Sequence, residues 1–335
     1  GPLWVKLADG TFGYQTGVTK AHCDCNGYQW LTNYHTMRYA LNRPDLGLFD
    51  SDRARVVADY VIHTMDNLGY QVPYGDMGGW GSIGGELRVL RAAEWFYRDG
   101  RYQWAINKKM GVRASMALGD FETATAEAPE PQGLVGAQLL PLDAAWYESF
   151  AGNQYVEPQQ AFDKVIFRDG FEPDDAYLLL DGLSGGGHGH FDGNSILRWT
   201  QNGRIWLGET ETDRFSSPPK NHNGVLIIKD GQSQKIPLYC GIANFADLPS
   251  ASISRSVCSD YAGVDWNRYI LWLHGQCFIV IDSMRADQPG DYSFRSVWQT
   301  VGNVTLNGAD LDVEQKGQHA RIAMPGDTRC ILTHE

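Results

Sequence analysis

The sequence predicts an α+β protein with a helical amino-terminal part and an antiparallel β part. Three observations support this fold class. Apolar residues recur every three or four positions up to about residue 120, which is the helical period. A stretch rich in alanine, glutamate and proline follows at 122–135. From about residue 164, short apolar runs alternate with two-residue turns, a pattern typical of antiparallel strands.

The amino-terminal part is expected to contain helix pairs joined by short loops. In the second helix, Val57, Tyr60, Val61 and Leu68 form one apolar stripe, and Gly69 follows it as a stop signal. A glycine-rich loop at 74–85 separates this helix from the third. The expected helices are 28–41, 51–68, 86–98, 102–118 and a short one at 144–149.

The carboxy-terminal part is expected to be a set of short strands. Asn202-Gly203 between two alternating runs is a strong signal for a tight β-hairpin. The predicted domains are therefore a helical domain at 1–121, a connector at 122–160 and a β domain at 161–335. The expected strands are 164–167, 176–180, 195–200, 204–207, 225–229, 251–256, 268–274, 277–281, 293–301 and 321–323.

Composition narrows the function classes. The chain has 335 residues, 43% of them hydrophobic and 20% charged, so two packed domains are expected. A formal net charge of -12 argues against a broad nucleic-acid-binding surface. A local basic cleft could still bind an anionic polymer. No stretch is apolar enough to cross a membrane, and no signal peptide is recognised.

The six cysteines contain no CxxC pair. Cys23 and Cys25 are too close in sequence for an easy mutual disulfide. Most of the cysteines are expected to be free and buried, and a bridge between Cys240 and Cys258 remains open.

The segment 181–194 carries the strongest chemical signal. If it is extended, His188, His190 and Asp192 share one face, and three glycines precede them. His222 follows just before an apolar run. This grouping predicts a metal site, a proton-transfer site or both. The alternative for Asp192, favoured over metal ligation, is a hydrogen bond to the following turn.

These residues resemble the heparinase II/III-like polysaccharide lyases. The resemblance rests on the Gly-rich His-Gly-His-x-Asp stretch, the following hairpin and the later Asn-His-Asn, and it is best over about 165–230. It implies a helical (α/α) toroid, here with few helices, packed on an antiparallel β sandwich. It also implies β-elimination on a uronic-acid-containing polysaccharide, with removal of the C5 proton and formation of a double bond.

The resemblance implies roles for residues of the β part. His188 corresponds to a histidine at the catalytic cleft. His190 and His222 correspond to ligands of a structural zinc, and a carboxylate after the hairpin completes that site. Glu209, one position away from the usual place, is the best candidate for this carboxylate, with Glu211 and Asp213 as alternatives.

In the helical part, the resemblance points to residues that neutralise the substrate carboxylate and move protons. Asn33 and His35 are the expected neutralising groups. The family's tyrosine has no clear counterpart, so Tyr74 is the first choice as base, with Tyr34 and His188 as alternatives. The substrate-binding candidates are Tyr34, Trp80 and Arg88. Helix packing or a solvated charge is the competing explanation for each of these residues.

Several alternatives remain open at this stage. A uronate C5-epimerase would remove the same proton, a carbohydrate-binding protein would keep the fold without turnover, and a metal-dependent hydrolase would need an open metal position. The polymer could be of heparan, chondroitin, alginate or ulvan type. A secreted or periplasmic location follows from the resemblance alone.

Overall fold

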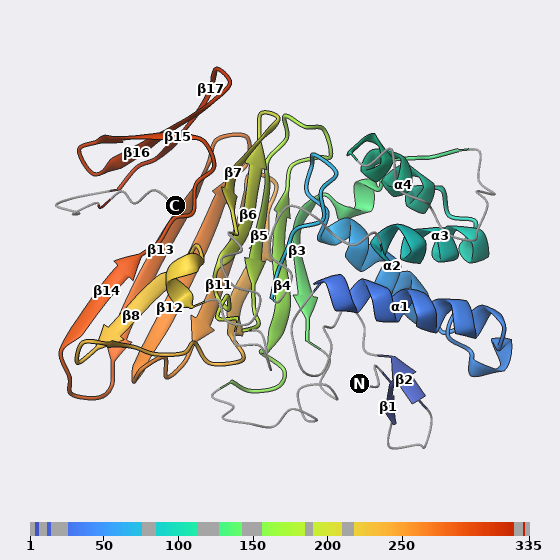
Figure 1. Cartoon of the computed structure of the whole chain (residues 1–335), viewed down its shortest axis with the longest axis horizontal. Coiled ribbons are helices and arrows are strands. Elements are labelled where there is room, and N and C mark those ends of the chain that lie inside the picture. Colours follow the sequence, from blue (N-terminus) through green and yellow to red (C-terminus); the bar gives the residue numbers. More distant parts are fainter. Residues whose placement is uncertain are drawn as a thin grey trace.

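The computed structural model describes residues 4–6, 12–14, 26–75, 85–112, 127–142, 156–184, 190–209, 218–324 and 331. Helices gather at one end of the molecule and strands at the other (Figure 1). The predicted α+β class, with helices followed by antiparallel sheets, is therefore confirmed.

The described helices match four of the predicted ones. They are α1 (Asn26–Leu41), α2 (Arg53–His63), α3 (Gly85–Tyr97) and α4 (Gly100–Val112). The short 3₁₀ helices η1 (Pro44–Leu46) and η2 (Gln132–Leu134) and a small hairpin of β1 (Trp4–Lys6) with β2 (Phe12–Tyr14) accompany them. These four α-helices do not by themselves show a closed toroid, so the toroid stays a prediction.

Helix α2 ends five residues before the predicted Leu68, and side chains explain why. Thr64 donates its hydroxyl to the Tyr60 carbonyl oxygen at 2.7 Å. Asp66 then accepts the backbone N–H groups of Leu68 and Tyr70 at 3.0 and 2.9 Å, which fixes a turn. Such side-chain bonds compete with the helical pattern, so the apolar stripe continues in sequence while the helix does not.

All described strand pairs are antiparallel, and most join strands that are neighbours in sequence; the pair of β14 (Tyr292–Ser296) with β8 (Val225–Lys229) is an exception. A five-stranded sheet contains β3 (Gly136–Pro141), β4 (Phe162–Arg168), β5 (Tyr177–Asp181), β6 (Ile196–Gln201) and β7 (Arg204–Gly208). Strand β3 lies inside the predicted connector, so the first edge of this sheet begins earlier than expected. Asn202 and Gly203 have φ of 54° and 67°, as the predicted β6–β7 hairpin turn requires.

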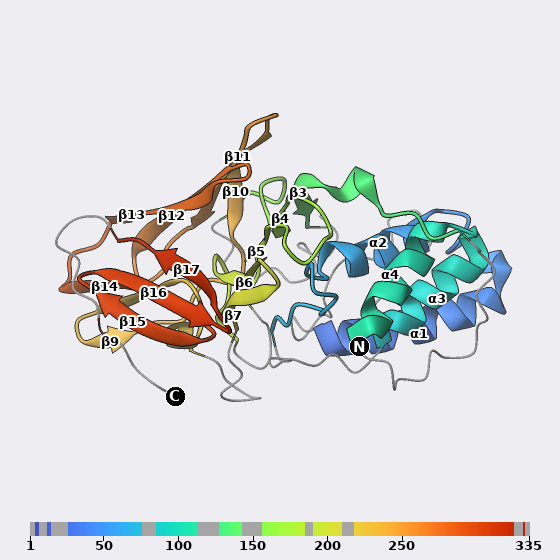
Figure 2. The same ribbon diagram turned by 90° about the horizontal axis from the view of Figure 1, so that it is seen from above.

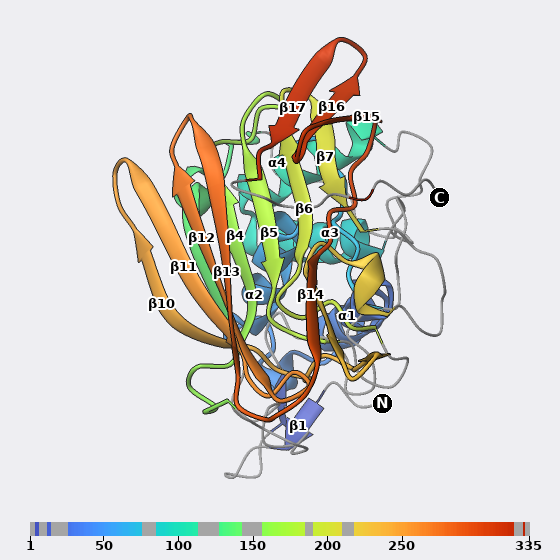
Figure 3. The same cartoon turned by 90° about the vertical axis from the view of Figure 1, so that its left-hand side faces the viewer.

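The other strands build the outer part of the β domain (Figure 3). One sheet has four strands: β10 (Gly241–Asp247), β11 (Ala251–Cys258), β12 (Val264–Leu273) and β13 (Cys277–Ala286). A second has β14 (Tyr292–Ser296), β8 (Val225–Lys229), which follows η3 (Pro219–Asn221), and β9 (Gln232–Ser233). A third has β15 (Asn303–Asn307), β16 (Asp310–Gln315) and β17 (Gln318–Ile322).

The five-stranded sheet is the middle layer of the molecule (Figure 2). Alternate residues of β4 point to its two faces. Ile166 packs in a core with the helices, whereas Val165 and Phe167 pack in a second core with β11 and β12. Every residue of β4 and β5 is buried because both faces are covered.

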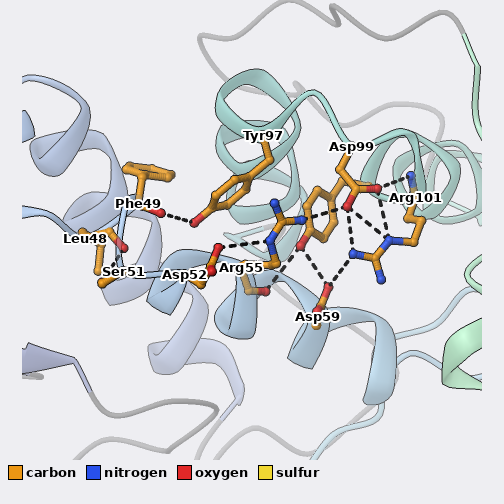
Figure 4. Close-up of polar contacts among 10 residues, drawn as sticks. Leu48, Phe49, Ser51, Asp52, Arg55, Asp59, Tyr97, Asp99 and Arg101 are labelled. Carbon is orange, nitrogen blue, oxygen red and sulfur yellow. Dashed lines mark hydrogen bonds and ion pairs between the residues drawn. The ribbon is translucent and has the colours of Figure 1, made fainter.

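A polar network ties α2 to the junction of α3 and α4 (Figure 4). Arg55 on α2 pairs with Asp99 at 2.9 Å, and Tyr102 on α4 donates its hydroxyl to Asp59 at 2.9 Å. Burial raises the pKa of Asp59, although nearby Arg101 opposes this. Arg55 and Arg101 are both paired with a carboxylate, so their charges are already compensated within the protein and they are not proposed to bind an anionic ligand.

None of the helices that the structure describes has both the length and the apolar character needed to cross a membrane.

Candidate functional site

Two of the three predicted metal ligands meet at the end of β7. The His222 Nδ1 atom makes a short hydrogen bond with Glu209 Oε2, and both side chains are buried. Asn223 donates to the Gly208 and Ile196 carbonyl oxygens at 3.2 and 2.8 Å and so fixes the strand ends around the pair. Burial raises the pKa of Glu209, and His222 opposes this rise.

The third predicted ligand, His190, is also buried, with 3% of its surface exposed. In the parts of the chain that the structure describes, no three His, Cys, Asp or Glu side chains gather closely enough to hold a metal ion. Zinc in proteins takes four ligands in a tetrahedron. The Glu209–His222 pair fits half of such a site, and the complete set of His190, Glu209 and His222 stays a prediction.

Among the described residues, a polar contact joins the helical part to the histidine segment. The backbone N–H of Gly75 donates to Asp192 Oδ2 at 2.9 Å, across 117 positions of sequence. The second carboxylate oxygen of Asp192 is buried and has no hydrogen-bond partner in the described part of the chain. The Asp192 side chain thus joins Gly75 to the residues that follow His190, while its backbone carbonyl oxygen accepts the Ser195 N–H in the following turn.

Tyr74 lies over a buried charged cluster next to this contact. The ammonium of Lys164 is 4.4 Å from the Tyr74 ring centroid and 2.8 Å from carboxylate oxygens of both Asp163 and Asp181. Burial raises the pKa of both carboxyls, although Lys164 opposes it, and the charge of Asp192 raises that of Asp181 further. Tyr74 itself is 1% exposed.

Asn33 on α1 is a buried amide. It is 1% exposed, and neither its nitrogen nor its oxygen has a hydrogen-bond partner among the residues that the structure describes. It lines a narrow space between α1 and α2 with Thr36, Met37, Leu48, Ala54 and Val57. Leaving a buried amide unpaired costs about 1–3 kcal/mol. Such groups are rare in folded proteins and are frequently functional.

His35 lies on a different face of α1 from Asn33, because residues two apart in a helix are separated by roughly 200°. It is exposed and lies beside the buried ring of Tyr34, with ring centroids 5.1 Å apart. The guanidinium of Arg88 on α3 lies 5.1 Å from the same ring, and Arg38 donates to the Tyr34 hydroxyl at 3.4 Å. Three basic side chains therefore surround Tyr34, and we call them the Tyr34 cluster.

Two predicted site residues, His188 and Trp80, lie outside the described residues, as do the alternative carboxylates Glu211 and Asp213. Their predicted roles stay predictions.

Comparisons with known proteins agree with this architecture. No protein-family model and no curated protein matches the sequence. Among solved structures, two of one heparinase III gene product, one of them with methylated lysines, align with TM-scores of 0.60 at 11% identity. They cover 87% and 90% of this chain. Another heparinase III crystal structure aligns over 86% of this chain, with a TM-score of 0.58 and 10% identity.

This chain has a heparinase-like polysaccharide lyase fold. At such low identity the likeness concerns the fold alone. The chain spans less than half of each matched protein, 42–44% of their lengths.

Sequence reasoning missed the charged cluster in this heparinase-like fold. Asp163 and Lys164 interrupt the apolar residues near the start of β4, and Asp181 ends β5 after an apolar run. Charges that interrupt the apolar residues of a buried strand are a usable signal, since buried charges must be paired. The contact between Gly75 and Asp192 had no sequence signal, because backbone N–H groups carry none.

Proposed function

We propose that the chain carries the active site of a lyase that cleaves a uronic-acid-containing polysaccharide by β-elimination. The heparinase III-like fold over nearly the whole chain is the observation that carries this proposal. The contact between Gly75 and Asp192 supports it, since it joins the loop of the proposed base to the segment of the proposed catalytic histidine.

The chemistry assigns a task to each group. The C5 proton of a uronate is weakly acidic, so its removal requires donors that stabilise the charge spreading into the carboxylate. The Asn33 amide, which has no partner among the described residues, could donate to the substrate carboxylate, and so could the exposed His35. Because the two side chains lie on different faces of α1, they cannot both bind the same carboxylate. Tyr74 would take the C5 proton, and His188 would assist departure of O4. Because Tyr74 and Asn33 are each 1% exposed, neighbouring side chains must move before substrate reaches them.

The experiment for this proposal is a panel of uronic-acid polymers mixed with the protein. Elimination leaves a C4–C5 double bond conjugated with the carboxylate, which absorbs in the ultraviolet. We expect absorbance to rise with at least one polymer. Fragments without the chromophore would indicate hydrolysis, and C5 inversion without fragments would indicate an epimerase.

A carbohydrate-binding protein without turnover is the second candidate, favoured by the burial of Tyr74 and Asn33. It predicts measurable binding to one polymer of the panel and no new absorbance with any of them. A secreted or periplasmic location belongs to the lyase proposal, because such polymers are extracellular.

The Tyr34 cluster is the proposed binding surface for the anionic chain. Arg88→Ala removes one cation while Tyr34 remains, and we expect the dissociation constant for the polymer to rise roughly tenfold, as for loss of one charged hydrogen bond. Arg285→Ala is the matched control, since this exposed arginine on β13 pairs with Asp287. Titration calorimetry at low salt measures both. If both variants lose the same affinity for the polymer, or if Arg88→Ala loses none, the Tyr34 cluster is not the binding surface.

A structural zinc held by His190, Glu209 and His222 is a separate part of the proposal. If bound, it would fix the segments around the cleft wall without entering the reaction. We expect one zinc per purified chain by elemental analysis, and its loss in His222→Ala. His319→Ala, an exposed histidine on β17, should keep the metal. If the wild-type protein stays zinc-free after dialysis against zinc, the proposed zinc site is wrong.

A further inference from the structure

Two buried cysteines lie at one end of the β10–β11 pair: Cys240 immediately precedes β10, and Cys258 ends β11. Strands β10 and β11 pair antiparallel, with Ile242 opposite Ser256 and Gly241 opposite Val257. One more step in this register places Cys240 directly opposite Cys258. Both are 0% exposed and belong to the core between the sheets.

The backbone hydrogen bonds show whether Cys240 and Cys258 form a hydrogen-bonded or a non-hydrogen-bonded pair of the antiparallel sheet. The N–H of Cys240 donates to the Gly182 carbonyl oxygen at 2.9 Å, and that of Ile242 donates to Gln160 at 2.8 Å. Alternate N–H groups here thus point away from β11. Cys240 and Cys258 therefore form a non-hydrogen-bonded pair, whose Cα atoms lie about 4.5 Å apart in antiparallel sheets. This falls within the range of about 4.4–6.8 Å at which disulfides form.

We propose that Cys240 and Cys258 form a disulfide bond that joins β10 to β11 under oxidising conditions. The oxidant is a disulfide such as oxidised glutathione. One cysteine thiolate attacks it and releases a glutathione thiol, and the second thiolate then displaces the other. A sulfur–sulfur bond forms in the protein, two electrons pass to glutathione, and the two thiol protons end on the released glutathione.

The bond would stabilise the residues just before the histidine segment, because these residues contact the residues just before Cys240. Ser184 donates its N–H to the Leu238 carbonyl oxygen at 2.9 Å, and Leu183 forms an isolated β-bridge with Tyr239. Cross-linking Cys240 to β11 therefore anchors residues 182–184, which immediately precede the glycines and His188. This inference stands whether or not the chain is a lyase.

Peptide mapping of the whole chain tests the bond. The hydrogen bond with Cys258, together with burial, raises the pKa of the Cys240 thiol well above its ordinary value, so the folded protein should oxidise slowly. The chain is therefore refolded with reduced and oxidised glutathione, alkylated, digested and mapped by mass spectrometry. We expect a linked peptide pair containing Cys240 and Cys258, and an unfolding temperature roughly 5–10 °C above that of the reduced protein.

Variants separate this bond from other thiol chemistry. Cys277→Ala removes an exposed thiol and should keep both the linked peptides and the rise in unfolding temperature. Cys258→Ala should lose both. If wild-type protein refolded in this way carries alkylated Cys240 and Cys258, or links either one to a different cysteine, the proposal is wrong. The wild-type map decides this even if Cys258→Ala fails to fold.

Discussion

Arg168→Leu is expected to destabilise the protein by about 3–5 kcal/mol, since a buried hydrogen-bond network would lose its charged donor and leave several acceptors unpaired. The Arg168 guanidinium donates to the carbonyl oxygen of Met65 and to Asn67 Oδ1, both at 2.6 Å, and also reaches the Ile62 and His63 carbonyls. It therefore joins the end of α2 to the middle sheet. Burial lowers its pKa to about 10, so it stays charged at neutral pH.

Thermal unfolding measures this effect, and a decrease of roughly 10 °C is expected. Arg285→Leu provides the control, because that exposed arginine on β13 should change stability by less than about 0.5 kcal/mol. If the two variants unfold at the same temperature, Arg168 does not hold the helices to the sheet.

Tyr74→Phe is expected to lower the rate of elimination by roughly 10²–10⁴-fold, the usual contribution of a general base. The phenyl ring can still lie over the Lys164 ammonium, so folding should be unaffected. Initial rates of product absorbance with the best polymer of the panel measure the loss.

Tyr39→Phe is the matched control, since Tyr39 is 56% exposed on α1 and its hydroxyl contacts only the exposed Arg43 among the contacts described. It should keep the wild-type rate. A Tyr74→Phe variant that is equally fast would transfer the role of base to Tyr34 or His188.

The order of helices and strands was predictable because local patterns determine it. The apolar stripe of α2 and the Asn202-Gly203 turn carry their structure in a few residues. Strand β3 was missed because it lies within the stretch predicted to be a connector. It is a strand because it pairs with β4. The end of α2 was misplaced because the Thr64 and Asp66 side chains bond to nearby backbone groups, and because Arg168, about a hundred residues away, binds the last carbonyl oxygens of the helix.

The candidate site was predictable only in part. The family resemblance led to Glu209 and His222, which lie 13 positions apart and are in contact. Asn33 and His35 are close in sequence, but residues two apart in a helix lie on different faces, so closeness in sequence does not bring their side chains together. The cluster around Lys164 depends on pairing between β4 and β5, which no local pattern reveals.

The most direct test of the lyase proposal is to analyse the products of digestion in water enriched in heavy oxygen. Elimination adds no water across the cleaved bond, so the new ends should carry no heavy oxygen, and fragment masses should sum to that of the parent chain. Incorporation of one heavy oxygen at each cleavage would contradict the proposal and identify a hydrolase.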